Sequence, residues 1–202
     1  MLEHEPGYLR EEDLGYLREE DSRYLTKLLL YPVESKEVDY KSAVKFEKGK
    51  DFAAKLVKHI LAFANSGGGY LIIGYKEQAD GSLAPDPGIT EKIVASYDTT
   101  RLCQYINTYL SGQGRIKIII FKVEFAGIKY PIIRIYRFQE CPFVCTKGCD
   151  SSESGGGAIL KKNKVYIRTD EAKTCVAATI EELPEWKQLT REITMLWREA
   201  RP

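Results

Sequence analysis

The chain has 202 residues, of which 44% are hydrophobic and 29% charged, and its formal net charge is +1. This length suits one domain with a substantial core and excludes two large ones, while the near-neutral charge excludes a uniformly basic nucleic-acid binder. Any positive surface must therefore be local. The sequence has no apolar run of membrane-spanning length and no signal peptide, so its five cysteines are expected to be reduced thiols of a cytoplasmic protein.

The first 30 residues are expected to form an acidic helical arm. The segment Gly-Tyr-Leu-Arg-Glu-Glu-Asp occurs at 7–13 and again at 15–21, and this spacing of eight drifts around a helix, which argues against a sustained coiled coil. We therefore expect residues 1–30 to dock on the core or on another subunit. Pro32 ends the arm, and residues 33–41 have the pattern of a strand.

A glycine triplet ends the next helix. Apolar residues at helical spacing predict an amphipathic helix over 51–65, and residues 70–75 follow as a short buried strand. The junction between them is Asn65, Ser66, Gly67, Gly68 and Gly69. Its glycines permit positive φ and close approach of another backbone, and its exposed amides make it a candidate phosphate or nucleotide loop. No Gly-Lys-Ser/Thr follows, and the glycines precede a strand, which excludes a Walker loop and a dinucleotide fingerprint.

The rest of the chain is predicted to mix helices with antiparallel strands. The expected elements are a loop at 79–88, a helix at 91–110, strands at 116–126 and 129–137, a loop at 139–157 and a hairpin at 158–168. Thr179 and Glu182 resemble a capping box that opens a last helix. This order predicts an α+β fold, with a mixed or antiparallel sheet flanked by helices. The core domain is expected over 31–190, and residues 191–202 end the last helix.

Three separated motifs resemble one known family. They are Glu34-Ser35-Lys36-Glu37-Val38-Asp39-Tyr40-Lys41, then Ala62-Phe63-Ala64-Asn65 followed by Gly68-Gly69-Tyr70-Leu71-Ile72-Ile73-Gly74, and finally Val165-Tyr166-Ile167-Arg168. Together they resemble the AlbA-like domain of the Schlafen family, over roughly residues 30–190. The resemblance implies nucleic-acid binding, and some members are endoribonucleases that act on transfer and ribosomal RNA. Such domains are also often described as ATP-binding.

The resemblance implies a site of three carboxylates. In the nuclease members, two acidic residues of the first strand and one after the glycine junction form a triad, and the matching positions are Glu34, Asp39 and Glu77. Three such oxygen ligands would hold Mg²⁺ or Mn²⁺, which activates water or stabilises charge on the phosphate. Asp39 stands where the family usually has Glu, and Glu77 where Asp is common, so each carboxylate is displaced by about one methylene. The alternative is that these carboxylates are surface groups paired with neighbouring lysines.

Basic residues gather before the first core helix and in the late hairpin. The predicted nucleic-acid contacts are Lys41, Lys45, Lys48, Lys50, Lys161, Lys162, Lys164 and Arg168. Lys41 follows Asp39 by two residues and is therefore expected on the same face of its strand, where it would bind a phosphate. Because acidic residues concentrate at the N-terminus, these clusters would leave a basic groove on a near-neutral protein. The alternative is that the lysines belong to solvated surfaces.

Three cysteines in the long loop form a candidate zinc site. Cys141, Cys145 and Cys149 are spaced within the range of structural zinc ligands. A tetrahedral site needs a fourth ligand, and Cys175 is the one other cysteine near them in the sequence. The alternative is that these residues are reduced thiols in a loop.

One histidine and several tyrosines also have functional and structural interpretations. His59 lies on the polar side of its predicted helix and has no evident serine or cysteine partner, so it is expected to be a surface histidine rather than a base. Tyr70, Tyr75 and Tyr166 offer rings on which unpaired bases would stack. The alternative for these tyrosines is packing with a hydrogen-bonded hydroxyl.

These patterns together predict a cytoplasmic domain that binds RNA or single-stranded nucleic acid. Metal-dependent endoribonuclease activity is the sharper hypothesis. A nucleotide-binding regulator that uses residues 65–69 is an alternative, although the missing Walker lysine speaks against ATP hydrolysis. A structural module that acts through the acidic arm is another. A single copy would need to form a homodimer to surround RNA as paired domains of the family do.

Overall fold

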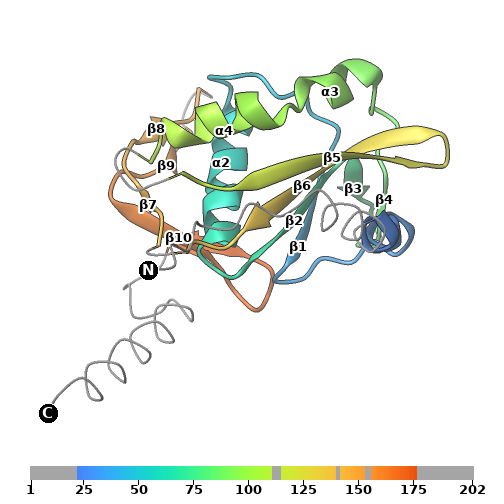
Figure 1. The fold of residues 1–202 in the computed structure, drawn as a ribbon, viewed down its shortest axis with the longest axis horizontal. Helices are drawn as coiled ribbons and strands as arrows, with labels where there is room; N and C mark the ends of the chain where they lie inside the picture. The colour runs from blue at the N-terminus through green and yellow to red at the C-terminus, as the bar shows by residue number, and fades with distance from the viewer. Residues whose placement is uncertain (1–21, 111–114, 140–141, 153–155, 177–202) are drawn as a thin grey trace, which may run out of the picture.

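A mixed four-stranded sheet forms the centre of the molecule. The computed structural model describes residues 22–110, 115–139, 142–152 and 156–176. The strands of the central sheet are, in spatial order, β1 (Val38–Lys41), β2 (Gly68–Ile73), β6 (Ile128–Tyr136) and β5 (Ile118–Phe125). β1 runs parallel to β2, whereas β2, β6 and β5 are antiparallel neighbours (Figure 1). Helices pack on this mixed sheet, which confirms the predicted α+β fold.

Helices cover both faces of this sheet. They are α2 (Asp51–Ala64), α3 (Glu91–Ser96) and α4 (Thr99–Asn107), together with a helical segment at 22–30. The apolar face of α2 forms as predicted, and its Leu56 and Ile60 share one hydrophobic cluster with Ile73 of β2. On the opposite face, Leu25 and Leu29 of the 22–30 segment pack with Ile72. Each buried Leu or Ile contributes about 1.5–3 kcal/mol, so the sheet is stabilised from both sides.

Short strands form three smaller sheets. They are β10 (Lys164–Arg168) between β11 (Thr174–Val176) and β7 (Val144–Cys145), β8 (Cys149–Asp150) with β9 (Ala158–Leu160), and β3 (Tyr75–Glu77) with β4 (Leu83–Pro85). The buried Asn65 side chain joins α2 to the first of them. Its Nδ2 donates to the carbonyls of Phe143 and Tyr166 at 2.9 and 3.0 Å, and its Oδ1 accepts the Phe143 N–H at 2.7 Å. The Ser66 hydroxyl accepts the N–H of Arg168 at 2.8 Å, which places Arg168 beside β1.

The prediction of a single helix at 91–110 is wrong, because two helices form there. The chain leaves the helical conformation before Asp98, whose carboxylate then caps α4 by accepting the N–H of Arg101 at 2.8 Å. Asp is a favoured N-cap residue, so this signal was present in the sequence. No helix within the described residues is long and apolar enough to cross a membrane.

Two strand predictions also need correction. The strand predicted at 33–41 is shortened to β1, because the backbones of Ser35 and Val38 bond to each other in a turn. The predicted hairpin at 158–168 does not form a ladder, since β9 pairs with β8 while β10 pairs with β7 and β11. The helix predicted from Thr179 lies outside the described residues.

The glycine triplet makes the close backbone contacts that the sequence predicts. A Cβ on Gly69 would lie 2.4 Å from the carbonyl oxygen of Glu37, and a Cβ on Gly68 would lie 2.6 Å from that of Ile135. Gly68 and Gly69 also have positive φ, at 90° and 152°. The N–H of Tyr70 donates to the Glu37 carbonyl at 2.8 Å. β1 and β6 therefore approach β2 this closely because residues 68 and 69 lack side chains.

Replacing Gly69 by Ala is expected to lower the free energy of unfolding by at least about 2 kcal/mol, because the methyl group meets both the Glu37 carbonyl and the Phe63 ring. Gly81→Ala is the matched control. Gly81 has a φ of 81° with no atom within 4 Å of an added Cβ, so we expect only the conformational cost of about 1 kcal/mol. Urea unfolding compares the two variants, and equal losses would show that backbone approach is not the constraint.

Candidate functional site

A pocket of about 1170 Å³ opens beside β1 and brings together residues that are far apart in the sequence. All three carboxylates of the predicted triad, Glu34, Asp39 and Glu77, line it. Lys41 and Arg168, two of the predicted nucleic-acid contacts, line it as well. Further polar side chains in its wall, which the sequence did not indicate, are Lys58, His59, Lys76, Lys173 and Thr174. The pocket thus gathers side chains from β1, α2, β3, β10 and β11.

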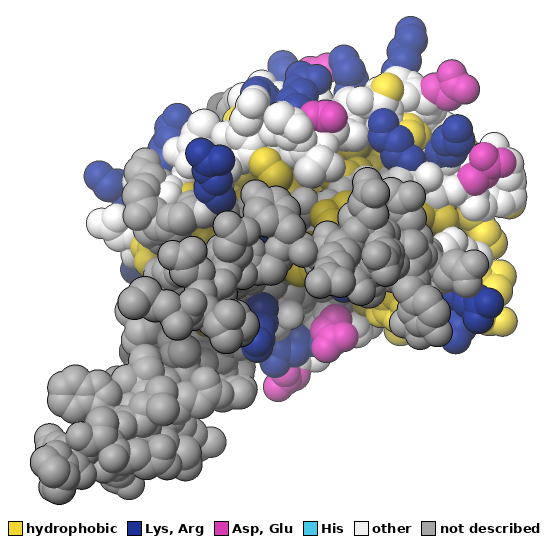
Figure 2. Space-filling view, in the orientation of Figure 1, with side chains coloured by type: hydrophobic (Ala, Val, Ile, Leu, Met, Phe, Trp, Pro, Cys, Tyr) yellow, Lys and Arg dark blue, Asp and Glu magenta, His cyan; other side chains and the backbone are white. Residues whose placement is uncertain are grey.

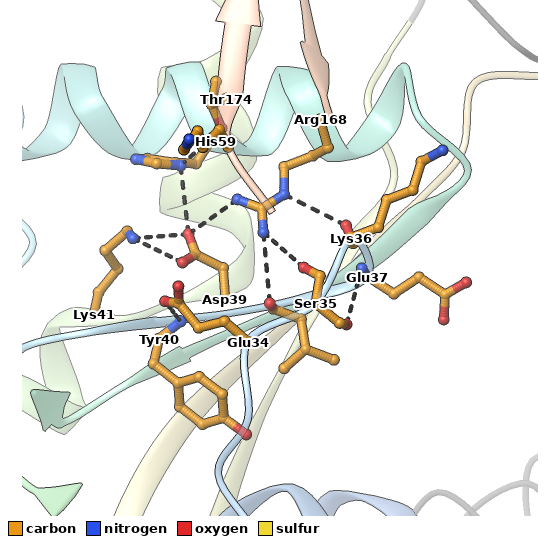
Figure 3. A network of polar contacts seen from close by, with 12 residues as sticks. Glu34, Ser35, Lys36, Glu37, Asp39, Tyr40, Lys41, His59, Arg168 and Thr174 are labelled. Carbon is orange, nitrogen blue, oxygen red and sulfur yellow. Dashed lines mark hydrogen bonds and ion pairs between the residues drawn. The ribbon is translucent and has the colours of Figure 1, made fainter. Parts of the chain in front are cut away.

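Asp39 lies at the centre of the polar network in this pocket (Figure 3). It alternates along β1 with Tyr40, which packs on the opposite face of the sheet, so the Asp39 carboxylate points toward α2. Its side chain is 3% exposed. Lys41 Nζ lies 2.9 Å from its Oδ1 and 2.8 Å from its Oδ2. His59 Nδ1 and Arg168 Nη1 lie 3.4 and 3.6 Å from Oδ2.

Arg168 is held beside Asp39 by the protein backbone. Its Nη2 donates to the carbonyls of Ser35 at 2.8 Å and Val38 at 3.5 Å, which fixes the turn before β1. Its guanidinium also lies 4.5 Å from the centre of the Phe63 ring. Burial lowers the pKa of Arg168, an effect that the negative charge of Asp39 opposes, and the group stays charged at neutral pH. The donors of Arg168 are directed at the protein itself in this arrangement.

The carboxyl groups of Glu34 and Asp39 form a coupled pair with opposite pKa shifts. Burial raises the pKa of Glu34, and its hydrogen bond with Asp39 and the charge of that residue raise it further. Burial also acts to raise the pKa of Asp39, but the hydrogen bond with Glu34 and the charge of Lys41 outweigh it, so the pKa of Asp39 is lowered. A proton taken up by this pair therefore resides on Glu34.

His59 belongs to the pocket, and the prediction that it lies on the polar surface of its helix is wrong. Its side chain is 23% exposed, and its Nδ1 lies 3.2 Å from Thr174 Oγ1. The sheet that contains β10 and β11 packs against this side of α2, which helical periodicity alone does not reveal. Burial, with a further contribution from the charge of Lys41, lowers the pKa of His59 to about 4 despite the opposing charge of Asp39. His59 is thus a neutral proton acceptor at neutral pH.

The three carboxylates are not grouped as metal ligands in this arrangement, and the Mg²⁺ or Mn²⁺ site stays a prediction. Among the described residues, no group of three or more His, Cys, Asp and Glu side chains is placed to hold a metal ion. The Lys41 ammonium contacts both oxygens of Asp39, where a divalent cation would have to bind. Binding of Mg²⁺ or Mn²⁺ by Asp39 would therefore require Lys41 to move.

The predicted zinc ligands are only partly described. Cys141 lies outside the described residues. Cys145 is buried, its Sγ donates to the Lys147 carbonyl at 3.2 Å, and burial raises its pKa, which favours the thiol over the thiolate that binds zinc. Cys149 is half-buried. The zinc site stays a prediction.

Six predicted lysine contacts lie outside the pocket. They are Lys45, Lys48, Lys50, Lys161, Lys162 and Lys164, and all six are exposed. Lys45 forms an ion pair with Glu47 at 2.6 Å. Figure 2 likewise shows Lys and Arg side chains interspersed with Asp and Glu on the face drawn there, as the near-neutral charge of the chain leads one to expect.

The two halves of the predicted phosphate loop, residues 65–66 and 67–69, have different surroundings. Asn65 and Ser66 are buried, and their side chains bond to the protein backbone as described above. The three glycines line a separate cavity of about 280 Å³. Of the three tyrosines considered for base stacking, Tyr75 and Tyr166 are buried and donate or accept hydrogen bonds with backbone, whereas Tyr70 is half-buried at the glycine cavity.

The pKa of His59 generates a prediction for stability against pH. Between about pH 6.5 and about pH 4 the unfolded chain binds a proton at His59 that the folded chain does not, so stability falls as pH falls. From about pH 7 to about pH 5 this contribution is about 2 kcal/mol. Urea unfolding at both pH values should show a drop in the wild-type protein that is smaller by this amount in His59→Gln. Equal drops in the two proteins would contradict a buried neutral His59.

The residues of this site lie within the part of the chain that matches a known protein family. The family model described as "Schlafen, AlbA_2" matches residues 34–177, which include all three motifs and the whole lining of the pocket except Pro32 and Val33. No curated protein matches the chain.

Two solved structures match part of this chain. One is the DIP2311 protein from Corynebacterium diphtheriae, with 17% identity and a TM-score of 0.45. The match covers 79% of this chain and 27% of the DIP2311 chain. This chain therefore spans little more than a quarter of that protein. The other is the N-terminal domain of a RecG-related protein from Nitrosomonas europaea, with 14% identity, a TM-score of 0.40, and coverage of 66% of this chain and 84% of that domain. Because the family model covers most of the chain, this protein belongs to the Schlafen AlbA_2 family.

Proposed function

We propose that this chain is a nucleic-acid-binding domain whose large pocket receives the sugar–phosphate backbone of RNA or of an unpaired strand. The observation that carries the proposal is the charge of the pocket wall. Five cationic side chains line it (Lys41, Lys58, Lys76, Arg168, Lys173) against three acidic ones (Glu34, Asp39, Glu77), a difference of +2 in a chain whose net charge is +1. Family membership supports the same class of ligand.

Four of the five cations of the pocket divide into two groups with different tasks, whereas the fifth, Lys173, forms an ion pair with Glu171 at 2.8 Å. Lys41 and Arg168 face Asp39 and balance its buried charge. Lys58 on α2 and Lys76 on β3 have no ion pair among the described residues and stand on different elements of the wall. Lysine in such a position binds a phosphate as a point charge, and each phosphate contact releases counterions. Lys58 and Lys76 are therefore the proposed phosphate contacts.

Replacing Lys58 and Lys76 together by Gln is expected to weaken binding of a labelled single-stranded RNA by about tenfold at low salt. The slope of log K against log salt should fall by about 1.4, or about 0.7 for each lost phosphate contact. Lys161→Gln with Lys162→Gln is the matched control, because it removes the same charge from exposed lysines outside the pocket. Fluorescence anisotropy over a salt series measures the RNA affinity of both variants and of the wild-type protein.

The control also separates the two candidate basic surfaces. If the Lys161 and Lys162 variant loses affinity and the pocket variant does not, the interface lies at the turn between β9 and β10. If wild-type protein binds no RNA at low salt, the proposed function is wrong.

Endoribonuclease activity is a second proposal, and the shared pocket of Glu34, Asp39 and Glu77 supports it. The groups described here would move protons: neutral His59 accepts one, and Glu34 is the carboxyl group that holds one. A scissile phosphate held by Lys58 would lie in the same pocket. We derive no metal-dependent step, because Lys41 contacts both oxygens of Asp39.

Glu34→Gln is expected to abolish cleavage of labelled transfer RNA, since an amide cannot act as a general acid or base. The affinity of the variant for the same RNA is expected to stay within about twofold of that of the wild-type protein. Glu124→Gln on β5 is the control, an exposed carboxylate outside the pocket. Parallel incubations with Mn²⁺ and with EDTA show whether any cut depends on a divalent ion. Absence of cleavage in the wild-type protein under both conditions, with binding intact, would reject the nuclease proposal and leave the binding proposal standing.

A further inference from the structure

The strand β5 forms the edge of the central sheet that lies farthest from the pocket. It pairs with β6 along its whole length and with no other strand among the described residues, whereas β1 forms the opposite edge. In Figure 1 the far end of the hairpin of β5 and β6 extends beyond the helices. An edge strand of eight residues presents a row of backbone N–H and C=O groups to which another strand can bond.

Alternation along β5 determines which of its residues direct these groups outward. The carbonyl of Lys117, just before β5, accepts the N–H of Tyr136 at 3.1 Å. Odd-numbered residues of β5 therefore bond to β6, and even-numbered residues direct their backbone groups away from it. The N–H of Ile120 accordingly donates to Thr99 Oγ1 of α4 at 3.2 Å. The helix α4 thus occupies the first half of this edge.

The second half of the edge, residues 121–125, is open. Lys122 and Glu124 direct their backbone groups outward there, and within the described part of the chain nothing bonds to those groups. Both side chains are exposed. On the other face of the strand, Phe121, Val123 and Phe125 are half-buried and pack on the cluster that contains the 22–30 segment. The open edge therefore offers free backbone groups, two opposite charges and an apolar row.

A second copy of the same strand matches this edge. In an antiparallel pair, residues with outward backbone groups must lie opposite each other, and like charges directly opposite are destabilising. Pairing Lys122 with its own counterpart, or Glu124 with its own, would join like charges. Pairing Lys122 of one copy with Glu124 of the other forms two ion pairs about a two-fold axis at Val123. The same register places Phe121 of each copy opposite Phe125 of the other, which extends the apolar row across the edge.

We propose that two copies of this chain join through antiparallel pairing of residues 121–125 of β5, with Lys122 of each copy opposite Glu124 of the other. The two central sheets then form one continuous sheet, as in other cases of strand addition at a sheet edge. β1 stays at an outer edge in each copy, and neither Lys122 nor Glu124 lines the pocket, so both pockets remain open. The inference goes beyond the proposed function and does not depend on it.

Sedimentation velocity on the full chain tests this pairing, over about a hundredfold range of concentration and with nucleic acid removed. Wild-type protein is expected to pass from monomer to dimer as its concentration rises. Lys122→Glu and Glu124→Lys each place like charges opposite one another, so each variant alone is expected to dimerise at least about tenfold more weakly. Lys162→Glu makes the same charge change on an exposed lysine of the turn between β9 and β10, and it is expected to dimerise as the wild type does.

A mixture of the two charge-reversal variants separates a lost ion pair from a folding defect. The Lys122→Glu chain has carboxylates at both positions, and the Glu124→Lys chain has ammonium groups at both. Every opposite pair in a mixed dimer is therefore an ion pair, and we expect the mixture to dimerise within about threefold of the wild type. The double variant, Lys122→Glu with Glu124→Lys, restores both pairs within a single kind of chain and should dimerise equally well.

Recovery of the dimer in the mixture, where each variant alone is monomeric, supports the proposal. A wild-type protein that stays monomeric at every concentration would overturn it and would mean that the two charges keep this edge from pairing. Equal dimerisation of the wild type and both single variants would also overturn it, because the contact would then lie elsewhere. So would two monomeric variants that remain monomeric when mixed. None of these measurements contains RNA, so failure of the proposed function leaves their result unchanged.

Discussion

The position of the candidate pocket depends on the side chain of Asn65. This amide uses both of its polar atoms to join the end of α2 to Phe143 and Tyr166, residues far along the chain. Ser66 continues the attachment by accepting the N–H of Arg168. Because Asn65 is fully buried, loss of these bonds would leave several backbone groups unsatisfied in the core. The glycines that follow then bring β1 against β2, so one junction places both Arg168 and Asp39.

Positive side chains of the pocket offset the desolvation cost of burying the Asp39 carboxylate. An isolated carboxylate at 3% exposure would be strongly destabilising, and here Lys41 and Arg168 supply compensating charge. Burial, together with the charge of Lys41, disfavours a proton on His59, whereas burial and Asp39 together raise the pKa of Glu34. Near neutral pH the pocket therefore holds His59 as a neutral proton acceptor, and Glu34 is the carboxyl group of the pair that takes up a proton first. That condition suits acid–base chemistry on a phosphodiester, and it also suits passive binding, which is why cleavage and affinity must be measured separately.

The sequence contained most of the local information and little of the long-range information. The glycine triplet after the helix predicted a close backbone approach, and the structure confirms it at Gly68 and Gly69. The triad positions Glu34, Asp39 and Glu77 were found through motif resemblance, and they do line one pocket. The place of His59 in the pocket was not found, because its exposure is decided by a sheet that begins more than 80 residues later in the chain. The pairing of β10 with β7 and β11 was missed for the same reason: short strands carry no periodic signal that names a distant partner.

Alternation along β1 decides which of its side chains reach the pocket. On β1, Asp39 and Lys41 face α2 and the pocket, whereas Tyr40 faces the opposite cluster, and on β2 Tyr70 shares that opposite face. β1 is an edge strand of the central sheet, and the 22–30 segment covers its other face, where the Tyr40 hydroxyl donates to the Leu28 carbonyl at 2.8 Å. The charged face of β1 is therefore the one that opens into the pocket.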